Sequence, residues 1–156
     1  MILEFIIIAS VIILDRYTKY LAVLYLKDIP GGTYPLIKDV LHLTYVENRG
    51  AAFSILQNFR WLFIGVTIIV SFVILIYLVR RQSSSVFLNV CLSLILGGAV
   101  GNLIDRIRFG YVVDFVDFRA INFAIFNVAD CAVTIGTILL AVCILLGGEK
   151  SDGKGR

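Results

Sequence analysis

Residues that hold metal ions or form disulfide frameworks are scarce in this sequence. It has one His and three Cys among 156 residues. The Cys lie in apolar runs without the paired spacing of a zinc site or a disulfide framework, so we interpret them as small apolar packing residues. His42 is interpreted as a solvated strand residue, because a metal site needs clustered ligands. The isolated His also weakens Ser/His and Cys/His nucleophilic schemes.

Charged residues are scarce as well, at 16% of the chain, whereas 60% of the residues are hydrophobic and the mean hydropathy is +0.96. Soluble domains are typically about 45–50% apolar, so the composition indicates a membrane protein. The net charge of +3 is too small to suggest a nucleic-acid partner. At this length we expect a single membrane-embedded domain, residues 1–156.

Four apolar runs are long enough to cross a hydrocarbon core about 30 Å thick as α-helices. They cover residues 2–26, 61–79, 86–104 and 128–146. The first run resembles a signal peptide. However, no Lys or Arg precedes it and no small-residue cleavage site follows, so we expect a retained helix. The predicted fold is an all-α polytopic membrane protein with four transmembrane helices.

Residues 27–60 form the one long polar stretch between these runs. Leu41 to Tyr45 alternates between apolar and polar residues, which predicts a half-buried strand. Asn48 to Gly50 is interpreted as a turn, and residues 51–56 as a short apolar helix lying in the membrane surface. We therefore expect a small extramembrane β-structure together with an interfacial helix.

Four crossings would place both termini on one side of the membrane, together with residues 80–85 and 147–156. Arg80 and Arg81 favour the cytoplasm for that side, but the opposite side also carries several Lys and Arg. The charge asymmetry by itself therefore does not determine the orientation. In this topology residues 27–60 and 107–127 lie together on the other side.

Residues 97–130 carry four Asp, although an apolar run lies on either side. A charged side chain inside a bilayer costs about 2.5–3.5 kcal/mol or more, so such residues persist mainly where they function or pair. Asp114 lies in the segment VVDF and Asp130 in FNVAD. Two carboxylates that share a site cannot both ionise cheaply, which leaves an acid beside a base. Such a pair can activate water and protonate a leaving amine.

Other uses of these carboxylates stay open at this point. They could form ion pairs with Arg106, Arg108 or Arg119, or they could belong to a proton or ion pathway. A pathway needs polar groups through the depth of the bilayer, and the runs 61–79 and 128–146 lack charges beyond their ends. A structural scaffold would gain nothing from so many polar residues on one side.

Three further patterns concern helix faces. Asp15 and Lys19 are four residues apart, so they share a face and can pair. Asn102, Asp105 and Arg106 have the spacing of one helix face. The glycines at positions 97, 98 and 101 form a small-residue face that a helix or a ligand can approach closely.

Five segments together resemble the motif set of bacterial lipoprotein signal peptidase (signal peptidase II). They are DRYTK (15–19), NRGAAF (48–53), GGAVGNLIDR (97–106), VVDF (112–115) and FNVAD (126–130). The segments extend from the first apolar run to the fourth, and the combination is far more specific than any one of them. The resemblance implies an intramembrane aspartic endopeptidase without metal or organic cofactor. It also implies four spans, both termini in the cytoplasm and a location in the bacterial cytoplasmic membrane.

The resemblance further implies a substrate and a site. The substrate would be a diacylglyceryl-modified prolipoprotein, cleaved just before its lipid-bearing Cys. The site would open at the outer membrane face beneath a small extracytoplasmic β-cradle and a short interfacial helix, and globomycin-type cyclic peptides would inhibit it. Asp114 and Asp130 would be catalytic. The implied substrate-binding residues are Asn48, Gly50, Asn102, Arg106, Asn127 and Ala129, and the implied supporting residues are Asp15, Lys19 and Asp105.

Overall fold

The computed structural model describes residues 1–50, 57, 59–80 and 85–148 of the chain. Within these residues there are four α-helices and one three-stranded sheet. The helices are α1 (Ile2–Leu26), α2 (Arg60–Val79), α3 (Val86–Arg108) and α4 (Val128–Gly148). The strands are β1 (Thr33–Ile37), β2 (Leu41–Asn48) and β3 (Val112–Phe118), and a short 3-10 helix, η2 (Arg119–Ile121), follows β3. The expected interfacial helix at residues 51–56 lies outside the described residues.

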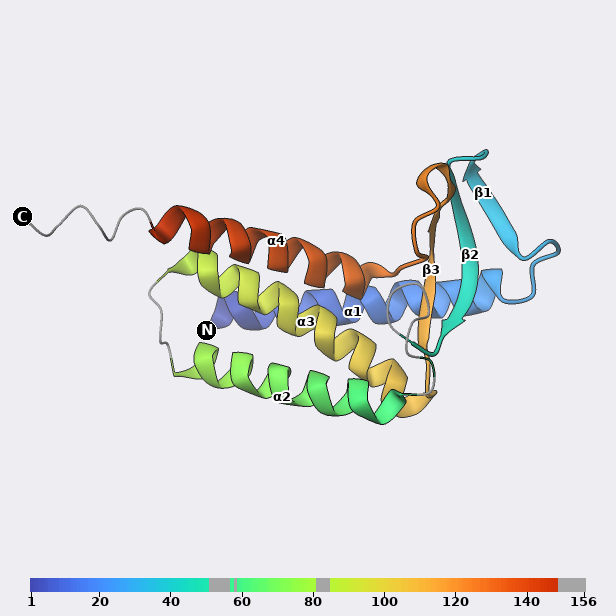
Figure 1. Ribbon diagram of the computed structural model, residues 1–156. Coiled ribbons are helices and arrows are strands. Elements are labelled where there is room, and N and C mark those ends of the chain that lie inside the picture. The colour runs from blue at the N-terminus through green and yellow to red at the C-terminus, as the bar shows by residue number, and fades with distance from the viewer. Residues whose placement is uncertain (51–56, 58, 81–84, 149–156) are drawn as a thin grey trace, which may run out of the picture.

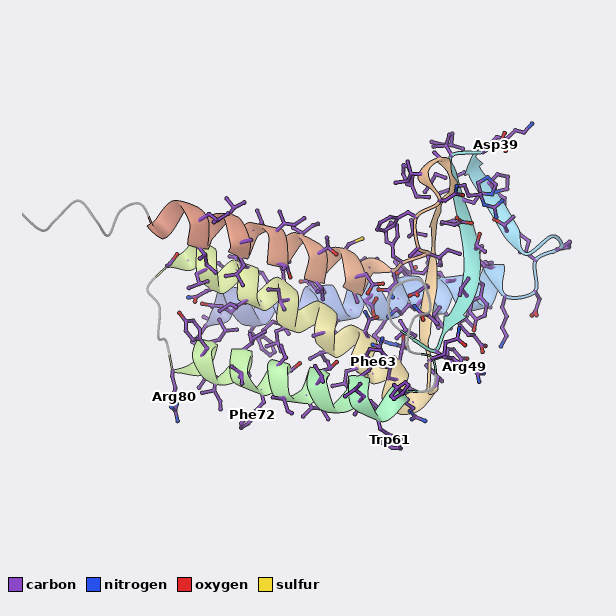
Figure 2. All side chains as sticks on the ribbon, in the orientation of Figure 1. Asp39, Arg49, Trp61, Phe63, Phe72 and Arg80 are labelled. Atoms are coloured by element: carbon purple, nitrogen blue, oxygen red, sulfur yellow. The ribbon has the colours of Figure 1, made fainter. Side chains whose placement is uncertain are left out.

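The helices form a bundle with the sheet at one end, while the N-terminus and the C-terminal end of α4 lie at the other end (Figure 1). Side chains mark the two ends in Figure 2. Arg49 and Trp61 lie near the sheet, and Arg80 lies at the opposite end of α2. Phe72 points outward from α2, away from the other helices. Arg49 and Trp61 therefore mark the sheet end of the bundle, and Arg80 marks the other end.

α3 is the central helix and packs against α1, α2 and α4. Glycines of α3 allow the neighbouring helices to approach closely. A Cβ atom at Gly101 would lie 2.8 Å from Asp15 Oδ2, and one at Gly98 would collide with the main-chain oxygen of Ala129. The small-residue face predicted from the sequence therefore lies against the neighbouring helices α1 and α4 at these two positions.

Three helices in the described part of the chain, α2, α3 and α4, are long and apolar enough to cross a membrane. α1 has the length, 25 residues, but it carries Glu4, Asp15, Arg16 and Lys19. The predicted count of four spans therefore stays a prediction. The helix bounds agree closely with the apolar runs, except that α3 continues to Arg108, beyond the run that ended at residue 104.

The sheet is antiparallel with the order β1-β2-β3. β2 contains the predicted strand and extends it to Asn48. β3 was not predicted, although its sequence, VVDFVDF, is rich in the β-branched and aromatic residues that favour strands. Val113 and Phe115 of β3 pack on Ala22 and Leu26 near the C-terminal end of α1. This contact fixes the sheet on the bundle and places the residue between them, Asp114, at the bundle's end.

His42 lies in β2 as expected, but the expectation that it is solvated is wrong. Only 7% of its surface is exposed. It lies opposite Asp117 in the sheet, and its Nδ1 is 3.2 Å from Thr33 Oγ1 of β1. The pairing of three strands covers this side chain, and pairing between distant strands is not visible in the local alternation.

Candidate active site

Asp114 is held near the middle of β3, with 2% of its surface exposed. Its Oδ1 accepts a hydrogen bond from Asn127 Nδ2 at 2.6 Å, and its Oδ2 accepts one from Asn48 Nδ2 at 2.8 Å. Burial raises the pKa of Asp114 to about 6, and the negative charge of Asp130 adds to this effect. The hydrogen bonds from the two amides act in the opposite direction. Asp114 is therefore a carboxyl group that can keep its proton in weakly acidic solution.

Asp130 lies in the first turn of α4 and takes part in the helix cap. Asn127 Oδ1 accepts from the N–H of Asp130 at 2.9 Å, and Asp130 Oδ2 accepts from the N–H of Asn127 at 3.2 Å. This reciprocal pair is a capping box, which satisfies N–H groups at the start of the helix. The other oxygen, Oδ1, accepts from Asn102 Nδ2 at 2.7 Å. The cap thus fixes the Asp130 carboxylate at the end of α4.

Asn127 connects the two carboxylates. It is fully buried, caps α4 with Asp130, and donates both to Asp114 and, at 3.1 Å, to Asn102 Oδ1. The structure therefore brings Asp114 and Asp130 into one hydrogen-bond network, which the sequence permitted without requiring it.

The alternative of ion pairing with nearby arginines is not what the geometry shows. Among the described residues, neither Asp114 nor Asp130 forms an ion pair. Arg119 pairs with Asp117 at 2.8 Å. Arg106 donates to the main-chain oxygen of Gly50 at 3.2 Å, and its guanidinium lies 5.2 Å from the centre of the Phe63 ring.

A buried charged cluster lies beside this network. Lys19 Nζ is 2.9 Å from Asp15 Oδ2, 2.9 Å from Asp105 Oδ2 and 2.8 Å from Asn102 Oδ1. Arg16 also pairs with Asp105. The predicted Asp15–Lys19 pair is thus present. Asp105 lies next to Arg106 in the sequence, but it pairs with the cations of α1. The sequence carried no signal for this partner choice.

A cavity of about 460 Å³ opens beside the two carboxylates. Of the predicted substrate-binding residues, Asn48, Asn102 and Arg106 line it. The other three do not line it: Gly50 accepts from Arg106, Asn127 joins the carboxylates, and the buried N–H of Ala129 donates to Asp15 Oδ1 at 3.0 Å. Sequence reasoning missed the apolar part of the wall. It comprises Val112, Phe123, Ala124, Ile125, Phe126, Cys131, Val133 and Ile135, together with Thr134.

The site thus combines two carboxylates, one of them with a raised pKa, and an apolar cavity at the end of a bundle of apolar helices. Comparison with known proteins identifies a family whose model matches this chain. The model of the family described as signal peptidase (SPase) II matches residues 7–146. The chain belongs to the signal peptidase II family. The resemblance carried by the five motifs is therefore confirmed, and the family is one of proteases.

Relatives in this signal peptidase II family are similar over almost their whole length. The lipoprotein signal peptidase of Caldanaerobacter subterraneus subsp. tengcongensis is 50% identical, covering 92% of this chain and 96% of that protein. That of Brevibacillus brevis is also 50% identical, covering 94% and 97%. That of Clostridioides difficile is 45% identical, covering 96% and 99%.

Solved structures agree with this assignment. Two structures described as bacterial membrane enzymes, both determined by the in meso method, are 34% identical to this chain. One superposes with a TM-score of 0.85 and covers 100% of this chain and 94% of its own. The other has a TM-score of 0.80, with 93% and 94% covered. This signal peptidase II family member therefore has the fold of known bacterial membrane enzymes.

Proposed function

We propose that this protein is an aspartic endopeptidase that removes the signal peptide from diacylglyceryl-modified prolipoproteins, cleaving just before the lipid-bearing Cys. The observation that carries the proposal is the pair Asp114 and Asp130, joined by asparagines at the wall of an apolar cavity. The relatives' name, lipoprotein signal peptidase, supports the substrate class. An apolar cavity also suits a substrate that carries acyl chains.

The proposed mechanism uses one water molecule and one shared proton. Asp130, as the base, removes a proton from the water while the water oxygen attacks the scissile carbonyl carbon. Asp114, whose pKa is raised to about 6, donates its proton to the carbonyl oxygen. When the resulting diol collapses, the C–N bond breaks, Asp130 gives its proton to the leaving amine, and Asp114 regains one from the second hydroxyl. These steps require no cofactor.

The side chains of α1 support its proposed role as a fourth span. Its buried face holds Asp15 and Lys19, which pair with each other, and Lys19 also pairs with Asp105 of α3. In contrast, Ile13, Tyr17 and Tyr20 are exposed. Charges that face the interior of a bundle and pair there are tolerated in membranes. The charged residues of α1 in this cluster therefore do not argue against a crossing.

With four spans, both termini and residues 80–85 and 147–156 would be cytoplasmic, and residues 27–60 and 107–127 would be extracytoplasmic. The site would then open at the outer face of the bacterial cytoplasmic membrane, below the sheet as a small cradle. Globomycin-type cyclic peptides would inhibit by occupying the cavity beside the carboxylates. The charged groups of this site gather at the sheet end of the bundle, which disfavours a relay across the bilayer.

A gel-shift cleavage assay with purified protein tests the proposal. A diacylglyceryl-modified prolipoprotein should lose its signal peptide, and the same precursor without the lipid should stay intact. Asp114→Asn protein serves as the enzyme control and should not cleave. Failure of folded parent protein to cleave the lipidated precursor would refute the proposed activity, and equal cleavage of both precursors would refute the proposed substrate class.

A further inference from the structure

We propose that Lys19 is a positioning residue, which fixes the side-chain amide of Asn102 so that its NH2 group donates a hydrogen bond to Asp130, the proposed base of the carboxyl pair. The inference rests on the proposed function, since it assigns the base in that reaction. The inference assigns a role to Lys19, a buried cation that lies outside the cavity.

The first step is the environment of the Lys19 ammonium. Only 1% of Lys19 is exposed, and its Nζ lies within 2.9 Å of three oxygens, one each from Asp15, Asp105 and Asn102. An ammonium group has three N–H donors and no acceptor. All three donors are therefore used, and Asn102 must present an oxygen to Lys19.

The second step is the orientation of Asn102. Because Oδ1 faces Lys19, the NH2 group occupies the other branch of the amide and donates to Asp130 Oδ1 at 2.7 Å. Asn127 Nδ2 also donates to Asn102 Oδ1, at 3.1 Å, which agrees with the same orientation. A rotated amide would place its NH2 group against the ammonium and against a second NH2 group. It would also place its oxygen against a carboxylate.

The third step is the protonation of Asp130. Its Oδ2 accepts from the main-chain N–H of Asn127, so with Asn102 in this orientation both of its oxygens act as acceptors. An ionised carboxylate only accepts, so donors on both oxygens favour that form. Rotation of the Asn102 amide would exchange a donor for an acceptor, and Asp130 Oδ1 would lose the hydrogen bond that it accepts from Asn102.

Several charged or titratable groups face Asp130 from the surrounding elements. Asp114 of β3 and Arg106 of α3 line the same cavity, Cys131 follows it on α4, and Lys19 of α1 lies one amide away. Arg106 and Asp114 act on Asp130 whatever the orientation of Asn102. Lys19 differs from them because, besides its charge, it acts through the amide, so its removal should have a signature that loss of fold stability does not have.

The test measures the pH dependence of kcat/KM for cleavage of a diacylglyceryl-modified prolipoprotein. The double variant Lys19→Met/Asp15→Asn removes one positive and one negative buried charge together, and the amide oxygen introduced at position 15 can still accept from the N–H of Ala129. We expect the acidic limb of its profile to move up by about one pH unit, which corresponds to the loss of a hydrogen bond to a charged group. Lys19→Arg, which keeps a donor, should largely restore the parent profile.

Two further variants separate positioning from stability. Arg16→Gln is the matched control, because Arg16 lies on the same helix and pairs with Asp105, while its hydrogen bond does not involve Asn102. It should lower the melting temperature and leave the acidic limb unchanged. Asn102→Asp keeps an oxygen for Lys19 but cannot donate to Asp130. It should move the acidic limb upward even if the double variant fails to fold.

The outcomes distinguish this inference from the proposed function. An inactive parent protein would refute both. An active parent together with an unmoved acidic limb in the double variant, or in Asn102→Asp if the double variant does not fold, would assign Lys19 to fold stability alone and would overturn the positioning role.

Discussion

Asn127 donates a hydrogen bond to Asp114 at 2.6 Å while its own side-chain oxygen caps the helix that begins beside it. The same residue therefore starts α4 and orients a carboxyl group on β3. Asp130 is thus part of a helix cap and Asp114 is hydrogen-bonded to the same cap, so the positions of both carboxyl groups depend on the start of α4.

Asp114→Asn and Asp130→Asn should each reduce cleavage by about 10³-fold or more while leaving the protein folded, because an amide can serve neither as base nor as acid. The double variant should be hardly worse than either single variant, since residues that act as a unit are not additive. Gel-shift rates and melting curves of the purified proteins in detergent measure both effects. Substantial cleavage by either folded single variant would exclude the pair.

Asp117→Asn is the matched control for these variants. Asp117 is also a buried carboxyl group of β3, but it pairs with Arg119 and Thr44 at the sheet. Its replacement should lower stability modestly and leave cleavage near the parent rate. Burial acts to raise the pKa of Asp117, but the hydrogen bonds from Arg119 and Thr44 prevail and hold that pKa below its usual value. This lowered pKa stabilises the folded state at pH values above the unfolded-state pKa of about 3.9. The stabilisation is lost as the pH falls from that value through the folded-state pKa.

Activity should depend on pH through Asp114. Its pKa of about 6 means that Asp114 is largely protonated below pH 6 and loses its proton as the pH rises through that value. Since the reaction needs one proton on the pair, kcat/KM should fall on the alkaline side of about pH 6 and again at strongly acidic pH. A rate that stays constant from pH 5 to pH 9 would contradict this assignment.

The same raised pKa of Asp114 predicts a stability effect. A carboxyl group whose pKa is higher in the folded state favours folding at low pH, and this contribution is lost as the pH rises from the unfolded value, about 3.9, through the folded one. The stability of Asp114→Asn relative to the parent should therefore increase as the pH rises from about 4 to 6. Melting temperatures of both proteins across this range test it, and a constant difference would contradict it.

Gly101→Leu should prevent folding or strongly reduce the amount of folded protein. A Cβ atom at this position would already lie 2.8 Å from Asp15 Oδ2 and 3.3 Å from Ala129 Cβ, so a larger side chain would separate α3 from α1 and α4. Gly65→Leu on α2 is the matched control, because nothing lies within 4 Å of a Cβ atom there. Size-exclusion profiles in detergent distinguish the two variants, and normal folding of both would show that the close approach is not required.

Membrane orientation is testable at the two ends of the bundle. Arg80 lies at the end of α2 away from the sheet (Figure 2), and Lys38 lies in the exposed connection between β1 and β2. In a variant without the three native Cys, a membrane-impermeant thiol reagent added to intact spheroplasts should label Lys38→Cys and should spare Arg80→Cys. The reverse pattern would invert the proposed topology.

The sequence by itself determined the helices of this protein and the family to which it belongs. Long apolar runs predict membrane helices from local composition, because each helix satisfies its own main-chain hydrogen bonds. The alternation at Leu41 to Tyr45 predicted part of β2 for a similar local reason. Five short motifs, spaced along the chain, were sufficient to indicate the family and to single out Asp114 and Asp130.

Only the tertiary structure decided which groups meet. The N–H of Ala129 donates to Asp15, 114 residues away in the sequence, and Arg16 pairs with Asp105 across 89 residues. The burial of His42 and the apolar wall of the cavity have the same origin. Contacts of this kind depend on how helices and strands pack in space. The sequence around a residue carries no local pattern that identifies its neighbours from distant segments. The orientation of the Asn102 amide, set by Lys19 from another helix, is therefore a property of the assembled bundle.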